Sequence, residues 1–213
     1  MLPEIFNNFK YILASQSPRR QHLLRELGFD FTVDVRETEE DYPLHLKKEE
    51  IALYISEQKA DAFTNKELEP TATLPGKILI TADTIVCHKG IVLGKPANAD
   101  DAFDILSRLS GSMHEVYTGI YLKSSEQRHS FFDMSQVYFK HLTSEEIQFY
   151  IEHCKPYDKA GAYGVQEWIG YVAVEKIVGS FYNVMGFPTH LFYQELKNFI
   201  LNHNNDSTTH TGN

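Results

Sequence analysis

Short apolar runs alternate with turn-forming residues along most of the chain, and this pattern predicts alternating strands and helices. The first run, residues 10–15 (KYILAS), is typical of a short buried strand. Ser17 and Pro18 then predict the start of a helix, because serine is a favoured N-cap and proline suits the first helical position. Three leucines at helical spacing give this helix an apolar face, and Gly28 is expected to end it.

The same reasoning predicts a series of elements up to residue 111. In order, they are a strand over 29–35, a helix over about 47–63, a loop over 71–76, a strand over 77–83 that ends in Asp83, a hairpin-like pair around Lys89-Gly90, and a helix capped by Asn98 that stops at Gly111. Lys59 falls on the second of the three helices predicted so far.

Beyond residue 111 the pattern is first rich in strands and then mixed. It predicts strands within 113–141, a helix opened by a capping box at 143–146, a glycine-rich loop of defined shape over 157–171, a strand near 171–178, and an amphipathic helix over about 188–201. The polar end of the chain has no such pattern.

Strands and helices in this order predict an α/β domain whose sheet carries helices on its faces. In such folds functional groups gather at the carboxyl ends of strands, so we expect the site there. We expect one domain of two lobes over residues 1–202, followed by a disordered polar tail over 203–213.

Composition supports a globular protein, because 42% of the 213 residues are hydrophobic and 13% are aromatic. Cys87 and Cys154 lie far apart and in no metal-ligand spacing, so neither a disulfide framework nor a zinc site is expected. The N-terminus lacks the pattern of a signal peptide, and no stretch approaches the roughly 18 apolar residues of a membrane span. We therefore expect a cytoplasmic protein that does not bind membranes.

Charge limits the partners further. The net charge of −9 argues against broad nucleic-acid binding, which needs a basic surface to release phosphate counterions. An acidic protein that binds a polyanion has to gather its cations at one place, so the positions of arginine and lysine become informative.

The first strand-to-helix turn carries two such cations, Arg19 and Arg20. A helix N-terminus offers unpaired N–H groups and a positive dipole end, and arginine adds bidentate donors, so this turn suits a phosphate. The other interpretation is that Ser17 only caps the helix and the arginines lie on a solvated face.

Asp83 stands at the end of a strongly apolar run, where a carboxylate can hold a divalent metal or accept a proton from water. A turn-forming aspartate that satisfies nearby amides is an equal alternative. The acidic run that includes Glu40 could supply a metal ligand or form a solvated loop. Lys59 and Lys95 are candidate phosphate partners, although single lysines are mostly surface residues.

Two common nucleotide-binding motifs are absent from the sequence, namely the GxxxxGK[ST] loop and the GxGxxG fingerprint, and the metalloprotease motif HExxH is absent as well. Phosphates would therefore bind through the serine-arginine turn and dispersed lysines.

Six segments follow one another along the chain: LASQSPRRQHLL, ITADTIV, LGKP followed by DAFDILSRLSG, HEVYTG, DKAGAYGVQ and GSFYNVMGFP. Taken in this order, over roughly residues 11–195, they resemble the Maf family of nucleoside triphosphate pyrophosphatases. The resemblance implies a mixed central β-sheet flanked by helices, with two lobes around a nucleotide-binding cleft, as in Maf and ITPase-like proteins. It also implies a homodimer.

The implied activity is cleavage of a nucleoside triphosphate between its α and β phosphates, which releases a monophosphate and pyrophosphate with the help of Mg²⁺ or Mn²⁺. The DKAGAYGVQ segment resembles the branch that acts on dTTP and UTP, whereas the branch associated with 7-methyl-GTP has a motif closer to DSAGSF.

The resemblance also implies roles for individual residues. The catalytic residue would be Asp83, which with Glu40 would hold the metal; the specificity residues would be Arg19, Thr84 and Gln166; and the phosphate-binding residues would be Arg20, Lys59 and Lys95. Ser17 joins them as a substrate-binding candidate because of the anion seat that its own turn forms. Two segments depart from the family pattern: Glu167-Trp168 stands where glycine often follows the glutamine, and VMGFP replaces VVGLP. The first departure bears on the shape of the base pocket.

Two other functions remain open at this point. One is a non-catalytic interaction protein that restrains cell division and septum formation, a role with which the family name has been linked. The other keeps the chemistry and changes the substrate to a modified nucleotide.

Overall fold

The structure, a computed structural model, describes residues 2–73 and 76–209, with side chains as far as residue 202. The strands are β1 (Lys10–Leu13), β2 (Phe31–Val33), β3 (Lys77–His88), β4 (Ile91–Leu93), β5 (Met113–Lys123), β6 (Arg128–Phe139) and β7 (Val174–Val178). The helices are α1 (Pro18–Glu26), α2 (Glu49–Asp61), α3 (Ala99–Leu109), α4 (Ser144–Cys154), α5 (Trp168–Ala173), α6 (Phe181–Val184) and α7 (Thr189–Thr209).

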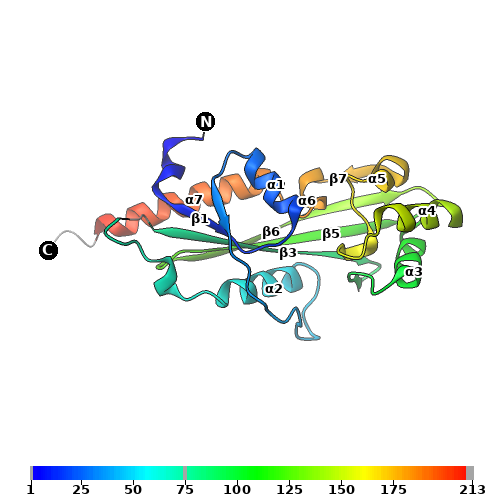
Figure 1. The fold of residues 1–213 in the computed structure, drawn as a ribbon, viewed down its shortest axis with the longest axis horizontal. Helices are drawn as coiled ribbons and strands as arrows, with labels where there is room; N and C mark the ends of the chain where they lie inside the picture. The colour runs from blue at the N-terminus through cyan, green and yellow to red at the C-terminus, as the bar shows by residue number, and fades with distance from the viewer. Residues whose placement is uncertain (1, 74–75, 210–213) are drawn as a thin grey trace.

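All the strands assigned in the described ranges join one mixed sheet in the order β2-β1-β3-β5-β6-β7, with β4 paired to β3. Strand β1 runs parallel to β2 and β3, whereas β3, β5, β6 and β7 pair antiparallel along the sheet. Helices α1, α6 and α7 lie on one side of the sheet and α2 on the other (Figure 1). The predicted mixed sheet flanked by helices is confirmed.

Two large apolar clusters form the two lobes. One packs α1 and α7 against β1 and the first half of β3, with Leu24, Ile80 and Phe192 at its centre. The other packs α3, α4 and α5 against the far halves of β3, β5 and β6, around Leu106 and Val137. Strands β3 and β5 run through both clusters, so they hold the lobes together.

The predicted helix caps are confirmed because they depend on local geometry. Ser17 Oγ accepts from Arg20 N at 3.4 Å, and Asn98 Oδ1 accepts from Asp101 N at 2.9 Å. The capping box between Thr143 and Glu146 has both of its hydrogen bonds.

Strand β3 does not end at Asp83, so that prediction is wrong. The strand continues to His88, because residues 79–87 pair with β5 along its other edge. The hairpin turn that follows has Lys89 and Gly90 at φ of 50° and 80°, as two-residue hairpin turns require.

Strand β3 also has a gap along one edge. The last residue of β1 lies opposite Ile80, and the last residue of β4 lies opposite Val86, so residues 81–85 have no strand partner on that side among the described strands. Asp83 and Thr84 lie in this gap, in the middle of a strand. The expectation that functional groups lie at carboxyl ends of strands is therefore wrong for these two residues.

The last part of the chain contains more helix than predicted. The loop predicted over 157–171 contains a 3-10 turn at Ala160–Ala162 and the start of α5, and α6 was not predicted. Helix α7 continues beyond residue 201 to Thr209. The end of the predicted tail, 210–213, and positions 74–75 of the predicted loop lie outside the described residues, and the domain limit at 202 stays a prediction. No helix in the described ranges is long and apolar enough to cross a membrane.

Candidate active site

A cleft of about 640 Å³ opens beside the gap in β3, where the two lobes meet. It is lined by all nine residues that the sequence analysis selected: Ser17, Arg19, Arg20, Glu40, Lys59, Asp83, Thr84, Lys95 and Gln166. Residues separated by up to 149 positions in the sequence therefore share one cavity. Six basic and four acidic side chains line the cleft, in a chain whose net charge is −9.

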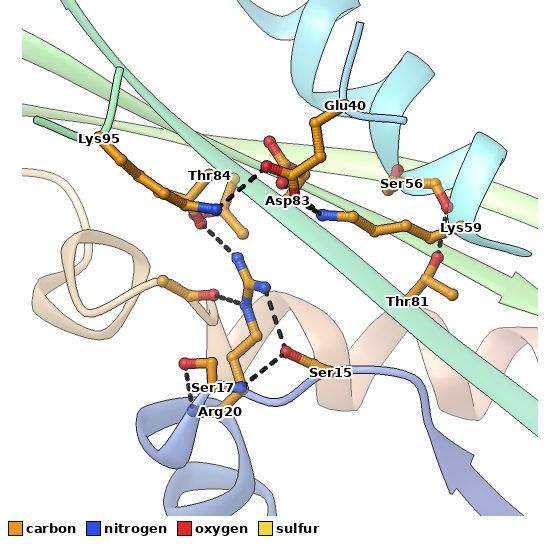
Figure 2. Close-up of polar contacts among 12 residues, drawn as sticks. Ser15, Ser17, Arg20, Glu40, Ser56, Lys59, Thr81, Asp83, Thr84 and Lys95 are labelled. Atoms are coloured by element: carbon orange, nitrogen blue, oxygen red, sulfur yellow. Dashed lines mark hydrogen bonds and ion pairs between the residues drawn. The ribbon is translucent and has the colours of Figure 1, made fainter. Parts of the chain in front are cut away.

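Arg20 is held from three sides rather than lying on a solvated face. Its Nε donates to the Gly186 carbonyl at 2.9 Å, its Nη2 to Thr84 Oγ1 at 3.0 Å, and its Nη1 to Ser15 Oγ at 3.3 Å (Figure 2). Burial lowers the pKa of Arg20, and the charge of Asp83 acts in the opposite direction. The guanidinium thus joins the first turn to β3.

Arg19 crosses the cleft instead. Its Nη1 lies 3.3 Å from Asp158 Oδ2, on the glycine-rich segment of the other lobe. Partial burial raises the pKa of Asp158, but Lys159 and Arg19 outweigh this effect and the pKa is lowered overall. Arg19 and Arg20 therefore have different surroundings, although they are neighbours in the sequence.

Asp83 points to the opposite face of β3 from Thr84, because successive residues of a strand alternate in direction. Its Oδ1 accepts from Lys59 Nζ at 2.7 Å, and the same ammonium lies 2.9 Å from Glu40 Oε1. Lys95 Nζ contacts the other Glu40 oxygen at 3.0 Å (Figure 2). Asp83 and Lys59 are mostly buried, whereas Glu40 and Lys95 are about half exposed.

The position of Lys59 follows from how α2 packs on the sheet. Gly119 is the partner of Asp83 in β5, and a Cβ added there would lie 2.6 Å from the Ala52 carbonyl carbon of α2. The helix therefore approaches the sheet closely at this position. Thr81 Oγ1, on the same face as Asp83, donates to the Ser56 carbonyl of α2 at 2.6 Å. Both contacts place the last turn of α2, and Lys59 with it, over Asp83.

The pKa of Glu40 reflects these contacts. Partial burial raises it, but the hydrogen bonds and charges of Lys59 and Lys95 outweigh burial and lower it to about 2. Glu40 is therefore a carboxylate at neutral pH, and both of its oxygens are engaged by ammonium groups.

The two carboxylates suit a divalent cation only together with other oxygen ligands. Glu40 Oε1 and Asp83 Oδ1 converge on one point, since the Lys59 ammonium lies within 3 Å of both. Hard oxygen donors of this kind fit Mg²⁺, which proteins usually bind through one or two carboxylates plus substrate phosphates. Within the part of the chain that the structure describes, no group of three or more histidine, cysteine or acidic side chains could hold a metal.

Thr84 and Gln166 lie on the other side of the cleft. Thr84 Oγ1 shares a hydrogen bond of 2.9 Å with Thr118 Oγ1, which contacts the Asn183 carbonyl. Gln166 lines the cleft, and its Oε1 is buried without a hydrogen-bond partner among the described residues. An amide oxygen of this kind is available to a ligand.

Sequence reasoning missed several residues that shape the cleft: Ser15, Arg36, Asp158, Lys159 and, in the layer behind it, Gly119. Lys159 is the least exposed cation in this group, with 8% of its side chain accessible. The sequence contained a partial signal for two of these residues, because Asp158 and Lys159 are the first two residues of the DKAGAYGVQ segment. Nothing in the sequence pattern marks Arg36, which packs over Phe63 and pairs with Glu67.

Comparison with known proteins gives a consistent result. The family profile described as "Maf-like protein" matches residues 10–199. A relative in Porphyromonas gingivalis named "dTTP/UTP pyrophosphatase" is 46% identical over 192 residues, which are 90% of this chain and 94% of that protein. Proteins of the same name in Flavobacterium johnsoniae (45%, covering 94% of this chain and 100% of the relative) and Bacteroides thetaiotaomicron (48%, covering 90% and 96%) are similar to it as well.

Proposed function

Because the chain belongs to the Maf family, we propose that it is a nucleoside triphosphate pyrophosphatase that hydrolyses dTTP and UTP to the monophosphate and pyrophosphate. The proposal rests on one observation: Asp83 shares a cleft with the two arginines of the first turn, Arg19 and Arg20, and with the lysines Lys59 and Lys95. The substrate class comes from the names of relatives that are 45–48% identical over at least 90% of this chain.

The triphosphate binds where the cations gather. A triphosphate carries about four negative charges, so an acidic protein needs a local excess of positive charge to hold it. The N-terminus of α1, capped by Ser17, presents backbone N–H groups beside Arg19 and Arg20. Lys59 and Lys95 reach the cleft from the other face of β3 and stabilise the charge that develops on the departing pyrophosphate.

Asp83 acts on the attacking water. The carboxylate accepts a proton as the water oxygen bonds to the α-phosphorus, and the bond from that phosphorus to the bridging oxygen of the β-phosphate breaks. Pyrophosphate leaves with the bridging oxygen. In the free protein Lys59, at 2.7 Å from Asp83 Oδ1, fixes the direction of the carboxylate before substrate binds.

A divalent cation, Mg²⁺ or Mn²⁺, would be held by Asp83 and Glu40 and would neutralise phosphate charge when bound. Phosphate oxygens would then exchange places with the carboxylates as partners of Lys59 and Lys95. The ion pairs of the free protein thus hold the lysines at the positions from which they meet the substrate.

The base is recognised on the side of Gln166 and Thr84. An amide and a hydroxyl can match both the donors and the acceptors of a uracil-like edge. Oε1 of Gln166, which is buried and has no hydrogen-bond partner within the described part of the chain, supplies an acceptor for the ring N–H of uracil or thymine. Modified pyrimidine nucleotides with the same edge remain within the proposed substrate class.

The proposed function is tested by incubating the purified protein with a panel of nucleoside triphosphates and Mg²⁺ or Mn²⁺. We expect UTP and dTTP to give UMP and dTMP together with pyrophosphate. Release of single phosphate would place the cleavage between the β and γ phosphates and overturn the proposed reaction. Equal turnover of all the triphosphates would overturn the proposed substrate class.

The remaining predictions concern the surroundings of the protein. The homodimer and the cytoplasmic location stay predictions. No feature of the described residues favours the alternative of a non-catalytic protein that restrains cell division.

A further inference from the structure

An ion-pair network centred on the buried Lys159 lies at the end of the cleft that holds Gln166. Lys159 Nζ is 2.7 Å from Asp158 Oδ1 and 3.1 Å from Glu167 Oε1, and 8% of the Lys159 side chain is exposed. Glu167 is also the residue at which the chain departs from the family pattern, since glycine often follows the glutamine there. The phosphate chemistry proposed above gives Glu167 no role.

The same carboxylate is tied to helix α4. Tyr150, whose ring is fully buried, donates its hydroxyl proton to Glu167 Oε2, and the hydroxyl oxygen accepts from Gly164 N at 3.0 Å. Burial, followed by the adjacent Glu167 carboxylate, raises the pKa of Tyr150, so the hydroxyl stays protonated as a donor. Glu167 N donates to the Gly164 carbonyl at 2.9 Å as well. These contacts close a small ring around Gly164.

The side chains of Gln166 and Glu167 both fold over this glycine. A Cβ at position 164 would lie 2.8 Å from the Glu167 carboxyl carbon and 2.9 Å from Gln166 Nε2. The amide of Gln166 and the carboxylate of Glu167 therefore both lie close to Gly164, within reach of each other. Gln166 Oε1 has no described partner to hold it in another way.

The network also reaches the first turn of the molecule. Asp158, which pairs with Lys159, contacts Arg19 Nη1 at 3.3 Å. A continuous chain of opposite charges thus runs from Arg19 through Asp158 and Lys159 to Glu167. Both ends of the glycine-rich segment, at 158–159 and at 166–167, are joined through the Glu167 carboxylate.

We propose that Glu167 is a positioning residue for base recognition: it holds the segment 158–167 closed, and thereby fixes the Gln166 amide in the orientation that selects a pyrimidine. This inference rests on the proposed function. Glu167 itself does not touch the base; it acts through Gln166 and, at the other end of the segment, through Lys159. Loss of the carboxylate should therefore alter discrimination between nucleotides more than it alters the cleavage step.

The first experiment compares Glu167→Gln and Tyr150→Phe with the wild type, using kcat/KM for UTP relative to GTP. Both variants keep the volume of the side chain, so the fold is expected to survive. We expect the preference for UTP to fall about tenfold in each, mainly through KM, because a misplaced amide no longer matches the base edge. Glu195→Gln is the matched control, since it removes the charge of an ion pair with His129 away from the cleft.

A double-mutant cycle with Gln166→Ala separates positioning from general damage. If Glu167 acts through Gln166, then Glu167→Gln lowers the nucleotide preference of the wild type but not that of Gln166→Ala. An unchanged preference in Glu167→Gln, or the same loss in both backgrounds, would overturn the proposal.

Hydrogen exchange does not depend on catalytic activity, so it tests the role of Glu167 separately from the proposed function. Hydrogen exchange of the amides in 160–167 should be faster in Glu167→Gln and in Tyr150→Phe than in the wild type, and unchanged in Glu195→Gln. Exchange at the wild-type rate in both Glu167→Gln and Tyr150→Phe would show that the segment is not held by Glu167. A wild-type protein that cleaves no triphosphate would refute the proposed function, while the exchange rates would still decide whether Glu167 closes the segment.

Discussion

Lys59 lies between the carboxylates of Asp83 and Glu40 and contacts both within 3 Å. At the scale of single residues, the two carboxylates differ: that of Asp83 is mostly buried, whereas that of Glu40 is about half exposed and also contacts Lys95. The clearest residue-scale predictions therefore concern these two acids.

Asp83→Asn should remove nearly all turnover and leave the fold intact. The amide keeps the size of the carboxylate and can still contact Lys59 through its oxygen, but it cannot accept a proton from water. We expect kcat to fall at least about a thousandfold, as is common when a catalytic base is lost. Steady-state kinetics and circular dichroism test this together; turnover close to the wild-type rate would refute the proposed role of Asp83.

Glu40 should stabilise the protein only above a certain pH. Its folded pKa of about 2 lies below the ordinary value of 4.5, so its ion pairs contribute stability that is present above pH 4.5 and is lost as the pH falls towards 2. The wild type should therefore be more stable than Glu40→Gln at pH 6, with the difference shrinking between pH 4.5 and 2. Urea unfolding of both proteins across this range gives the measurement, and a constant difference would contradict the prediction.

At the scale of elements, helix α2 has to lie close to the sheet for Lys59 to reach Asp83. Gly119 allows this approach, and the Thr81 hydroxyl fastens the helix through the Ser56 carbonyl. The buried Lys123 also holds the end of α2, since its ammonium donates to the carbonyls of Ala60 and Phe63. A lysine in this place satisfies carbonyls that the helix leaves unpaired.

Gly119→Ala should displace α2 and lower activity. The added methyl group would clash with the backbone of Ala52, which cannot move aside without shifting the helix, so we expect a loss of about 1–3 kcal/mol in the free energy of unfolding. We also expect at least a tenfold fall in kcat/KM, because Lys59 moves away from Asp83.

Gly76→Ala is the matched control for this change. The nearest described atoms to a Cβ there belong to Phe9, at 3.7 Å, and to the Leu68 carbonyl, at 3.9 Å, and these are ordinary contacts. Denaturant unfolding and kinetics of both variants, and of Gly119→Ala combined with Lys59→Ala, test the prediction. If the glycine acts through Lys59, the combined variant should be no less active than Lys59→Ala alone.

Structural features that depend on contacts between residues close together in the sequence were predictable, whereas those that depend on contacts between distant residues were not. Ser17, Asn98 and Thr143 were correctly predicted as caps, because a cap contacts backbone three residues away. The end of β3 was placed wrongly at Asp83, since the strand continues through its pairing with β5, in which the partner of Asp83 is Gly119, 36 residues further along the chain. The short helices α5 and α6 have too few residues to show a period.

The site was predictable to a similar degree. Residue chemistry and the resemblance to a family together selected nine residues that line one cleft, although their roles stay predictions. Lys159 was overlooked because a lysine in a loop is usually exposed, and its burial follows from Asp158 and Glu167 in the folded protein. Gly119 was overlooked because the space that it leaves is occupied by a helix far away in the sequence.

At the scale of the whole molecule, the cleft lies between two apolar clusters that share β3 and β5. A ligand that contacts both lobes binds the folded protein and not the unfolded chain, so it should raise the melting temperature. With pyrophosphate and Mg²⁺ at about 100 times the dissociation constant, the stabilisation is about 2.7 kcal/mol, which corresponds to roughly 5–10 °C for a chain of this size.

Arg20→Ala should remove most of this thermal shift, because Arg20 donates into the cleft from α1 and holds Thr84 in place. Differential scanning fluorimetry with and without pyrophosphate compares the two proteins. A shift of equal size in Arg20→Ala would show that the phosphates bind elsewhere.

Asp83 and Thr84 follow each other directly yet point to opposite faces of β3, so the carboxylate proposed for catalysis and the hydroxyl proposed to contact the base are separated by a single peptide unit. Inserting or deleting one residue between Ile80 and Asp83 would exchange the two faces and present the hydroxyl to Lys59 and the acid to Arg20. We expect relatives to vary freely in the length of the 34–48 loop while the count of residues along this strand stays constant.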